Sequence, residues 1–358
     1  MLFPYTYVPH QMEKMQEFID FIFYDVWCKA PAGEVFGFDL FNGKPELREV
    51  IVAFHYSDGK GADFFNGHVE RIYNLFKNLS ADDIQKFKQW YESNNNVQVA
   101  CSDPSSLHLI RYVELVTEFK DVTAEIEKFF KGLYASSLLT LIALKEKIGH
   151  IDEHYESFMS VNKQGKCPFC GYNDVKGVYH EKREAYDHYL PKDKYPFNTI
   201  NFYNLIPTCH ECNSTYKLAK DPAHITKDPL SAARKAFYPF NENEYQIDID
   251  LELKTTDWTN IKPDEIDIAF GPIELDEEIK TWLDIYDVDN RYKAKCCGEN
   301  DGKGWLREVI DDSGNYGKTP SEFLACKLKT AKKDPWVDAN FLKAPFLEAC
   351  GRKGLFTD

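Results

Sequence analysis

The chain has 358 residues, 43% of them hydrophobic and 28% charged, which is long enough for two or three structural units and argues against disorder. A formal net charge of −15 argues against a protein that coats nucleic acid with its whole surface. The longest apolar run, residues 138–144, is too short to cross a bilayer, and the first residues lack a secretory-signal pattern. We therefore expect a cytoplasmic protein without a membrane partner.

Residues 1–160 are expected to form a mainly helical unit. Apolar residues recur at helical spacing from Met15 to Val26, and residues 68–79, 81–93 and 107–119 repeat this pattern, the second of these after a predicted cap at Ser80. Residues 122–159 add one or two further helices. Between the first two helices, residues 37–54 combine turn signals with one strand-like run.

The segment 161–225 differs in character, because cysteines, histidines, asparagines and aromatic residues replace the helical pattern. From Lys163 to Lys220 there are nine Lys and Arg against six Asp and Glu, an excess of three positive charges, whereas the rest of the chain totals −18. This contrast indicates that the segment carries the functional site.

Residues 226–358 are expected to mix helices and strands. Apolar and acidic residues alternate over 246–254, which predicts a half-exposed strand, and residues 265–270 predict another. Residues 276–286 read as a helix, and helical stretches with a Gly-rich loop over 311–319 follow. The GKT in that loop is not a phosphate-binding loop, since Asp312 stands where that motif needs glycine. The whole chain is predicted to be α+β.

Two CxxC pairs, Cys167 with Cys170 and Cys209 with Cys212, predict a four-sulfur zinc site. The rival interpretation, a redox pair, expects one CxxC beside a βαβ pattern, whereas this chain has two. The 38 residues between the pairs exceed the usual zinc-ribbon loop, so we expect a folded unit between them. The other six cysteines are expected to be ordinary thiols.

Within that unit the order is predicted to be strand, strand, helix. The first strand ends near Asp187, His188 and Pro191, the second bears Asn204, and the helix carries Asn213 and Lys217. Because successive strand residues face opposite sides, Asp187 and His188 can serve one site only where the strand is distorted or ends.

The segments DHYLPK, NFYNLIPTC and CNSTYK resemble the HNH endonucleases, whose ββα-metal finger is often braced by zinc on two CxxC pairs. The resemblance covers about 60 residues and implies that His188 is the general base and that Asn204 orients it. It further implies that Asp187 and Asn213 bind a catalytic divalent ion. Hard oxygen ligands of this kind suit Mg²⁺ or Mn²⁺, and Asn204 would fix one imidazole tautomer through its carbonyl oxygen.

Three lysines are candidates for substrate contact. Lys217 lies one helical turn after Asn213 and could equally be solvated or meet a phosphate, and Lys192 and Lys194 are expected to contact the nucleic-acid backbone. His180 and Arg183, which precede the first strand, are interpreted as ordinary surface residues.

The sequence thus predicts a metal-dependent endonuclease that hydrolyses DNA, with RNA as an alternative substrate. The competing interpretation is a zinc-stabilised module that binds nucleic acid or protein without turnover. Residues 280–292 look similar to a segment of some phage-defence HNH proteins, including nuclease subunits of Septu-type systems that work with an ATPase. This similarity raises antiviral defence, an ATPase or other regulatory partner, and a homo-oligomer as expectations.

Overall fold

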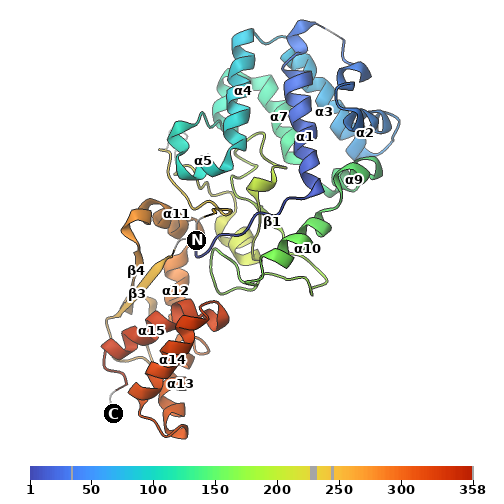
Figure 1. Ribbon diagram of the computed structural model, residues 1–358. Helices are drawn as coiled ribbons and strands as arrows, with labels where there is room; N and C mark the ends of the chain where they lie inside the picture. The colour runs from blue at the N-terminus through green and yellow to red at the C-terminus, as the bar shows by residue number, and fades with distance from the viewer. Residues whose placement is uncertain (34, 226–231, 243–245, 357–358) are drawn as a thin grey trace.

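The computed structural model describes residues 1–33, 35–225, 232–242 and 246–356. A mainly helical N-terminal region and a C-terminal region of one hairpin and five helices lie on opposite sides of a small central unit (Figure 1). The fold is α+β, as the sequence predicts. Buried side chains from all three regions form one hydrophobic cluster, so the central unit is not isolated from its neighbours.

The N-terminal region contains ten α-helices within the part of the chain that the structure describes. They are α1 (Lys14–Phe21), α2 (Pro45–His55), α3 (Lys60–Phe76), α4 (Ala81–Asn95), α5 (Val97–Ser102), α6 (Tyr112–Glu118), α7 (Lys120–Gly132), α8 (Ser136–Leu139), α9 (Ile142–Ile148) and α10 (Ile151–Val161).

The first predicted helix is confirmed, but its second half is π-helical, which the sequence pattern does not indicate. α1 continues as a π-helical stretch, Ile22–Trp27, and the predicted apolar face from Met15 to Val26 is buried. A short 3₁₀ turn follows and ends at Gly33, whose φ of 98° suits glycine. Ser80 caps α4 by accepting a hydrogen bond from the backbone N–H of Asp83, also as predicted.

The strand-like run within residues 37–54 was interpreted wrongly, because it lies in helix α2. Its β-branched residues suggest a strand, yet Leu47, Val50, Ile51 and Phe54 are the buried residues. These positions recur at spacings of three and four, which puts them on one helical face, and Pro45 occupies the first turn, where its missing N–H costs nothing. Packing of that face overrides the local strand preference.

The central unit is a two-stranded antiparallel hairpin followed by a short helix. β1 (Tyr186–His188) pairs with β2 (Leu205–Pro207) so that Asp187 lies opposite Ile206 and His188 opposite Leu205. The helix, Cys212–Lys217, is π-helical. The predicted order of strand, strand and helix is confirmed, although Asn204 lies in the turn before β2 rather than on the strand.

The C-terminal region begins with the two predicted strands, β3 (Asp248–Leu253) and β4 (Ile266–Gly271), which the structure pairs as an antiparallel hairpin. Leu251 and Leu253 are buried while Asp248, Asp250 and Glu252 are exposed. The alternation of apolar and acidic residues therefore reflects a strand with one buried and one exposed face, as predicted. The helices that follow are α11 (Asp276–Tyr286), α12 (Val288–Cys296), α13 (Gly302–Asn315), α14 (Pro320–Lys333) and α15 (Asn340–Arg352). α13 includes most of the predicted Gly-rich loop.

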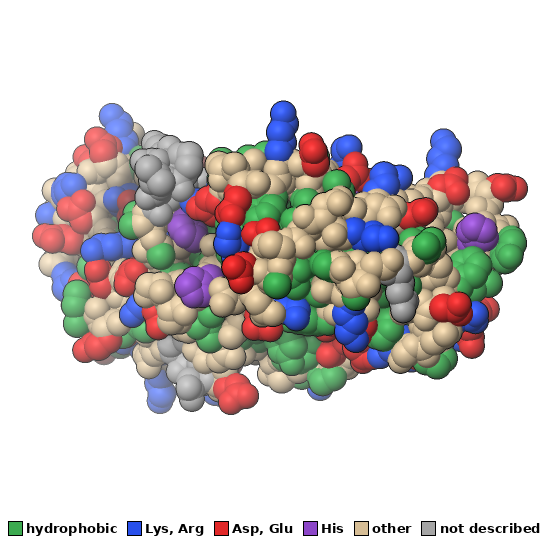
Figure 2. Space-filling view, turned by 90° about the horizontal axis from the view of Figure 1, so that it is seen from above, with side chains coloured by type: hydrophobic (Ala, Val, Ile, Leu, Met, Phe, Trp, Pro, Cys, Tyr) green, Lys and Arg blue, Asp and Glu red, His purple; other side chains and the backbone are tan. Residues whose placement is uncertain are grey.

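The predicted domain boundaries remain predictions. α10 ends at Val161, next to the first boundary, whereas residues 226–231, where the second boundary falls, lie outside the described residues. Among the helices that the structure describes, each is too short or too polar to cross a bilayer. Seen from above, acidic and basic side chains are interspersed over the face shown, without a broad area of one charge (Figure 2).

Candidate metal centre and candidate active site

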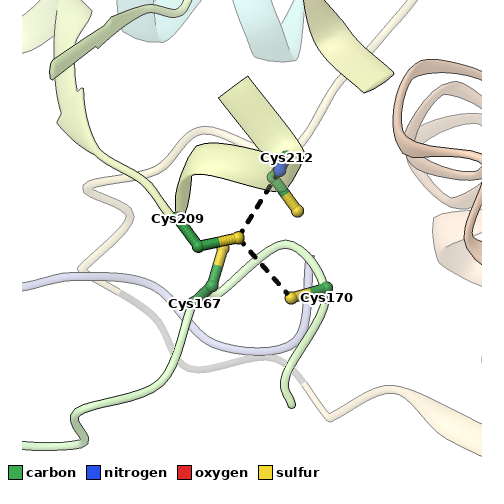
Figure 3. A group of neighbouring side chains, drawn as sticks. All are labelled: Cys167, Cys170, Cys209 and Cys212. Carbon is green, nitrogen blue, oxygen red and sulfur yellow. Dashed lines mark hydrogen bonds between the residues drawn. The ribbon is translucent and has the colours of Figure 1, made fainter. Parts of the chain in front are cut away.

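The four cysteines of the two CxxC pairs come together as predicted. Cys167 and Cys170 lie on a loop before β1, Cys209 follows β2, and Cys212 begins the π-helix, with the four sulfur atoms turned toward one another (Figure 3). All four are buried, and their sulfur atoms lie within 4.8 Å of one another. The Sγ atoms of Cys170 and Cys209 are 4.0 Å apart.

This spacing suits a structural zinc ion. Tetrahedral coordination with Zn–S bonds of about 2.3 Å sets the sulfur atoms about 3.8 Å apart. Burial raises the pKa of the Cys167 thiol, and its cysteine neighbours raise it further, so four thiolates are stable together only around a cation. The residues present therefore fit a bound Zn²⁺, and the position is well placed to brace the hairpin.

Side chains outside the motif contact the sulfur atoms. Arg291 of α12 approaches Cys212 Sγ at 3.4 Å from Nη1, pairs with Glu211 and lies 4.1 Å over the ring of Tyr216. Asn173 Nδ2 is 3.5 Å from Cys209 Sγ. Positive charge and N–H groups of this kind stabilise thiolate ligands.

Two aromatic residues fix the backbone of the first CxxC loop. Trp282 of α11 donates from Nε1 to the Phe169 carbonyl at 2.8 Å, and the Tyr292 hydroxyl of α12 donates to the Cys170 carbonyl at 3.1 Å. With Arg291, these residues belong to the segment 280–292. Sequence reasoning singled out that segment by similarity but missed its role, since nothing in its pattern indicates contact with the cysteines.

The first CxxC loop also meets the N-terminal residues and helix α15. The backbone N–H of Leu2 donates to the Pro168 carbonyl at 2.8 Å. Gly171 has a φ of 77°, and a Cβ there would lie 2.3 Å from Leu2 and 2.7 Å from Phe341 of α15. Only glycine allows this close packing of three segments.

β1 ends at His188, which confirms the prediction that the strand terminates at the Asp–His pair. The two side chains lie on opposite faces of the strand and contact different neighbours. Asp187 faces the π-helix, and His188 faces the loop after β1 and the end of α7.

Asp187 is buried and forms an ion pair with Lys217. Lys217 Nζ lies 2.9 Å from Asp187 Oδ1 and donates to the His188 carbonyl at 2.8 Å, and its side chain has no exposed surface. The alternatives weighed for Lys217, a solvated lysine or a direct phosphate contact, both need an accessible ammonium group, which this arrangement does not provide. Burial raises the pKa of Asp187, and Lys217 opposes that shift.

The second oxygen of Asp187 is the unusual atom of the pair. Oδ2 is buried and has no hydrogen-bond partner within the described residues. A carboxylate oxygen left in this state carries a desolvation cost that a bound cation would relieve. Lys217 holds the other oxygen, and metal binding by Asp187 stays a prediction.

The imidazole of His188 is oriented by a backbone carbonyl. Nε2 lies 3.0 Å from the Thr199 oxygen, and because a carbonyl only accepts, Nε2 carries the proton and Nδ1 the lone pair. Tyr134, just after α7, packs edge-on against the ring with centroids 5.1 Å apart. Burial, with a smaller contribution from Lys192, lowers the pKa of His188 to about 3, so the imidazole is neutral near pH 7.

The prediction that Asn204 bonds to the imidazole is wrong. Its Oδ1 accepts from the Leu190 N–H at 2.7 Å, and its Nδ2 donates to the carbonyls of Leu190 and Asn198. An amide side chain can satisfy both N–H and C=O groups of a passing backbone, and Asn204 uses this capacity to close the loop after β1. Asn204 therefore positions the loop after His188 and does not contact the imidazole ring through a hydrogen bond.

Helix α4 clamps that loop from the N-terminal region. Asn94 donates from Nδ2 to the Pro196 carbonyl at 3.0 Å, and its backbone carbonyl accepts from Asn198 Nδ2 at 3.3 Å. Asn201 donates to the Asn95 carbonyl at 3.0 Å. Thr199, whose carbonyl orients His188, lies between these anchored residues. Sequence reasoning missed the clamp, because its partners are about 100 residues apart.

The remaining predicted residues lie around this centre. Asn213 is half-buried on the π-helix one turn before Lys217, and no side-chain hydrogen bond is found for it among the described residues. Lys192 and Lys194 are both partly exposed. Burial lowers the pKa of Lys194, Asp221 opposes this, and the cations Arg111, Arg234 and Lys217 lower it further. Substrate contact by Lys192 and Lys194, and metal binding by Asn213, stay predictions.

Comparison of the chain with protein-family models, with curated proteins and with solved structures finds no match.

Proposed function

We propose that this protein is a metal-dependent endonuclease of the HNH type that hydrolyses phosphodiester bonds of DNA, with His188 activating water. The observation that carries the proposal is the His188 imidazole at the end of β1. Its Nε2 is held by the Thr199 carbonyl, so that Nδ1 can accept a proton. The Asp187 carboxylate belongs to the preceding residue and lies on the other face of the strand, where Lys217 pairs with it. The buried four-cysteine cluster, which fits zinc, supports the strand–strand–helix frame that the resemblance requires.

His188 has the form that a general base needs before the reaction. A neutral imidazole with its protonated nitrogen fixed can take a proton from water only at the other nitrogen. A pKa of about 3 makes a weak base, but a bound phosphodiester brings negative charge beside the ring and raises that pKa. The nearby cations Lys192 and Lys217, which now lower the pKa, would be partly offset by the same negative charge.

Asp187 is the residue that would hold the catalytic ion, through the partnerless Oδ2. A Mg²⁺ or Mn²⁺ ion bound there would neutralise charge on the leaving oxygen. Lys217 fixes the carboxylate through Oδ1 and so positions Asp187 without touching substrate. Asn213 is proposed as a further oxygen ligand on the strength of the resemblance.

A zinc-stabilised binding module without turnover is the second candidate, and one observation favours it. The Asp187–Lys217 ion pair already supplies the carboxylate with a positive partner, as a purely structural pair does. RNA as substrate, a role in phage defence, an ATPase partner and a homo-oligomer stay predictions from the resemblance.

Plasmid nicking with Mg²⁺ or Mn²⁺ distinguishes the two candidates. We expect His188→Ala to lower the cleavage rate by roughly 10²- to 10⁴-fold, the usual contribution of a general base, with zinc content and thermal stability unchanged. His180→Ala, which removes an exposed imidazole eight residues earlier, serves as the matched control and should cleave normally. Cleavage by His188→Ala at the wild-type rate, or none by the wild type on DNA or RNA with either ion, would refute the proposed function.

A further inference from the structure

A cavity of about 190 Å³ lies beside the candidate active site. Tyr134 lines it, and the same ring packs against His188 with centroids 5.1 Å apart. One aromatic side chain therefore separates the cavity from the proposed base. The cavity is therefore close enough to His188 to be considered as a site for the nucleotide next to a phosphodiester bound there.

The cavity wall offers both hydrogen-bond donors and acceptors. Arg183 donates from Nε to Asp152 Oδ1 at 2.7 Å and from Nη1 to the Glu184 carbonyl at 3.0 Å, which uses two of its five N–H groups. Asp152 Oδ2 lies 3.2 Å from His150 Nδ1. The guanidinium, the carboxylate and the imidazole all line the same cavity.

One polar atom of the wall lacks a partner. The Tyr134 hydroxyl is buried and makes no hydrogen bond of good geometry within the residues that the structure describes, although the Arg183 guanidinium lies close enough to act on it. Burial raises the pKa of Tyr134 to about 12, and nearby Arg183 acts against this shift. A buried hydroxyl without a partner is costly, and a ligand with a polar edge would satisfy it. Leu139 and Ile151 provide apolar surface in the same cavity.

These features select a nucleobase over a phosphate. A phosphate has only acceptor oxygens and would face the Asp152 carboxylate, whereas the edge of a base carries donors and acceptors and its faces are apolar. The volume equals about six water molecules at roughly 30 Å³ each, which suits one heterocycle without its sugar. The sugar and its phosphate would then stay outside, toward His188.

We propose that this cavity binds the unstacked base of a nucleotide next to the bond that is cleaved, with Arg183 and Asp152 reading its edge. The inference rests on the proposed nuclease function and adds a substrate class to it. A base enters such a cavity only when it is unpaired, so the preferred substrate is single-stranded, looped or distorted nucleic acid. Arg183, interpreted from sequence as ordinary surface, becomes a specificity residue.

The test measures binding, with catalysis removed by His188→Ala. Short fluorescent single strands of DNA and of RNA, each with one abasic position moved stepwise along the strand, are titrated by anisotropy. We expect one abasic position to weaken binding on the order of tenfold, and Arg183→Gln to weaken the intact strand by a similar factor. In the protein that also carries Arg183→Gln, the same abasic position should weaken binding little further, because the two changes remove the same contact.

Two further variants complete the comparison. Lys182→Gln removes one positive charge from an exposed neighbouring residue. In this variant the abasic position should weaken binding as much as it does without the substitution. Tyr134→Phe removes only the hydroxyl and should reduce the abasic effect even if Arg183→Gln unfolds, which a thermal melt would reveal.

Other results would overturn the inference. If an abasic position weakened binding equally in His188→Ala and in His188→Ala, Arg183→Gln, no base would enter the cavity. An equal loss of duplex and single-strand binding in Arg183→Gln would indicate a phosphate contact instead. Absence of binding to every strand would also refute it. Because cleavage is not measured, base binding can be confirmed even if the nicking assay rejects the proposed chemistry.

Discussion

Lys217 is a charged side chain without exposed surface, a state that proteins tolerate only when the charge is paired and hydrogen-bonded. Its partners are Asp187 Oδ1 and the His188 carbonyl, so one ammonium group ties the π-helix to both residues of the Asp–His pair. The position of the candidate base therefore depends on a residue that does not contact the cavity or the solvent.

We predict that Lys217→Met destabilises the protein by about 3–5 kcal/mol, because Asp187 is left buried without a compensating charge. The double variant Asp187→Asn, Lys217→Met should lose less than the sum of the two single losses, since neither partner is then charged. Urea denaturation measures these free energies of unfolding. Lys163→Met, at an exposed lysine, is the control and should change stability by less than about 0.5 kcal/mol. A loss as small as the control's would mean that the ion pair is not formed.

At the residue scale, the sequence predicts which residues form the cysteine cluster and end the strand better than it predicts their hydrogen-bond partners. The four cysteines and the terminating strand at His188 follow from spacing and residue type, and the structure agrees with both. The Thr199 carbonyl as partner of His188 was missed, because every residue carries a carbonyl and only the folded loop selects one. Asn204 was assigned the wrong partner for the same reason.

At the scale of elements, helices α11 and α12 support the four-cysteine cluster that fits zinc. Trp282 and Tyr292 hold the first CxxC loop by its carbonyls, and Arg291 contacts the sulfur of Cys212 in the second pair. Both pairs are thus supported by one helical segment, through contacts between residues 79 to 122 positions apart in the chain. The metal centre joins the central unit to the C-terminal region.

Arg291→Met is expected to lower zinc affinity by roughly 10- to 100-fold, the usual effect of losing a residue that supports metal ligands. Its guanidinium is buried beside Cys212, and removal takes away a positive charge and an N–H donor from the thiolate. Competition with a chromophoric chelator measures the affinity. Arg307→Met, at a partly exposed arginine of α13, is the matched control. Equal zinc affinity in both variants would show that Arg291 supports the fold without supporting the metal.

Prediction of elements succeeded where the hydrophobic period is long and failed where packing overrides propensity. The alternation over β3, the cap at Ser80 and helix α11 (Asp276–Tyr286) are readable from local pattern. Helix α2 was read as strand-like, because Val50, Ile51 and Val52 favour strands locally, while their contacts with other helices decide the outcome. The π-helical stretches at Ile22–Trp27 and Cys212–Lys217 have no sequence signal that we recognise.

At the scale of the whole molecule, the first CxxC loop is where distant parts of the chain meet. Leu2 bonds to the Pro168 carbonyl, and Trp282 bonds to the Phe169 carbonyl. The hydroxyl of Tyr5 also donates to the carbonyl of Pro207 at the end of β2. Loss of the metal should therefore affect both flanking regions, not the cysteine loops alone.

Removal of zinc by a strong chelator is expected to raise backbone hydrogen exchange in residues 1–6 and 280–292 together with residues 163–218, because the contacts just described are lost as a group. Helices α3 and α7, which lie in the N-terminal region, should keep their protection and provide the internal control. Mass spectrometry of peptic fragments resolves these segments. Increased exchange confined to the cysteine loops would contradict the expected coupling.

The packing of Gly171 against Leu2 and Phe341 has a consequence for biosynthesis. Phe341 leaves the ribosome 170 residues after Gly171, which takes on the order of ten seconds or more at typical elongation rates. During that interval the first CxxC loop lacks part of its cover, so we expect a nascent chain to pass through a state in which the four-cysteine cluster is not fully packed. Any activity that depends on this cluster, the proposed DNA cleavage included, would then begin only after helix α15 has been synthesised and has packed.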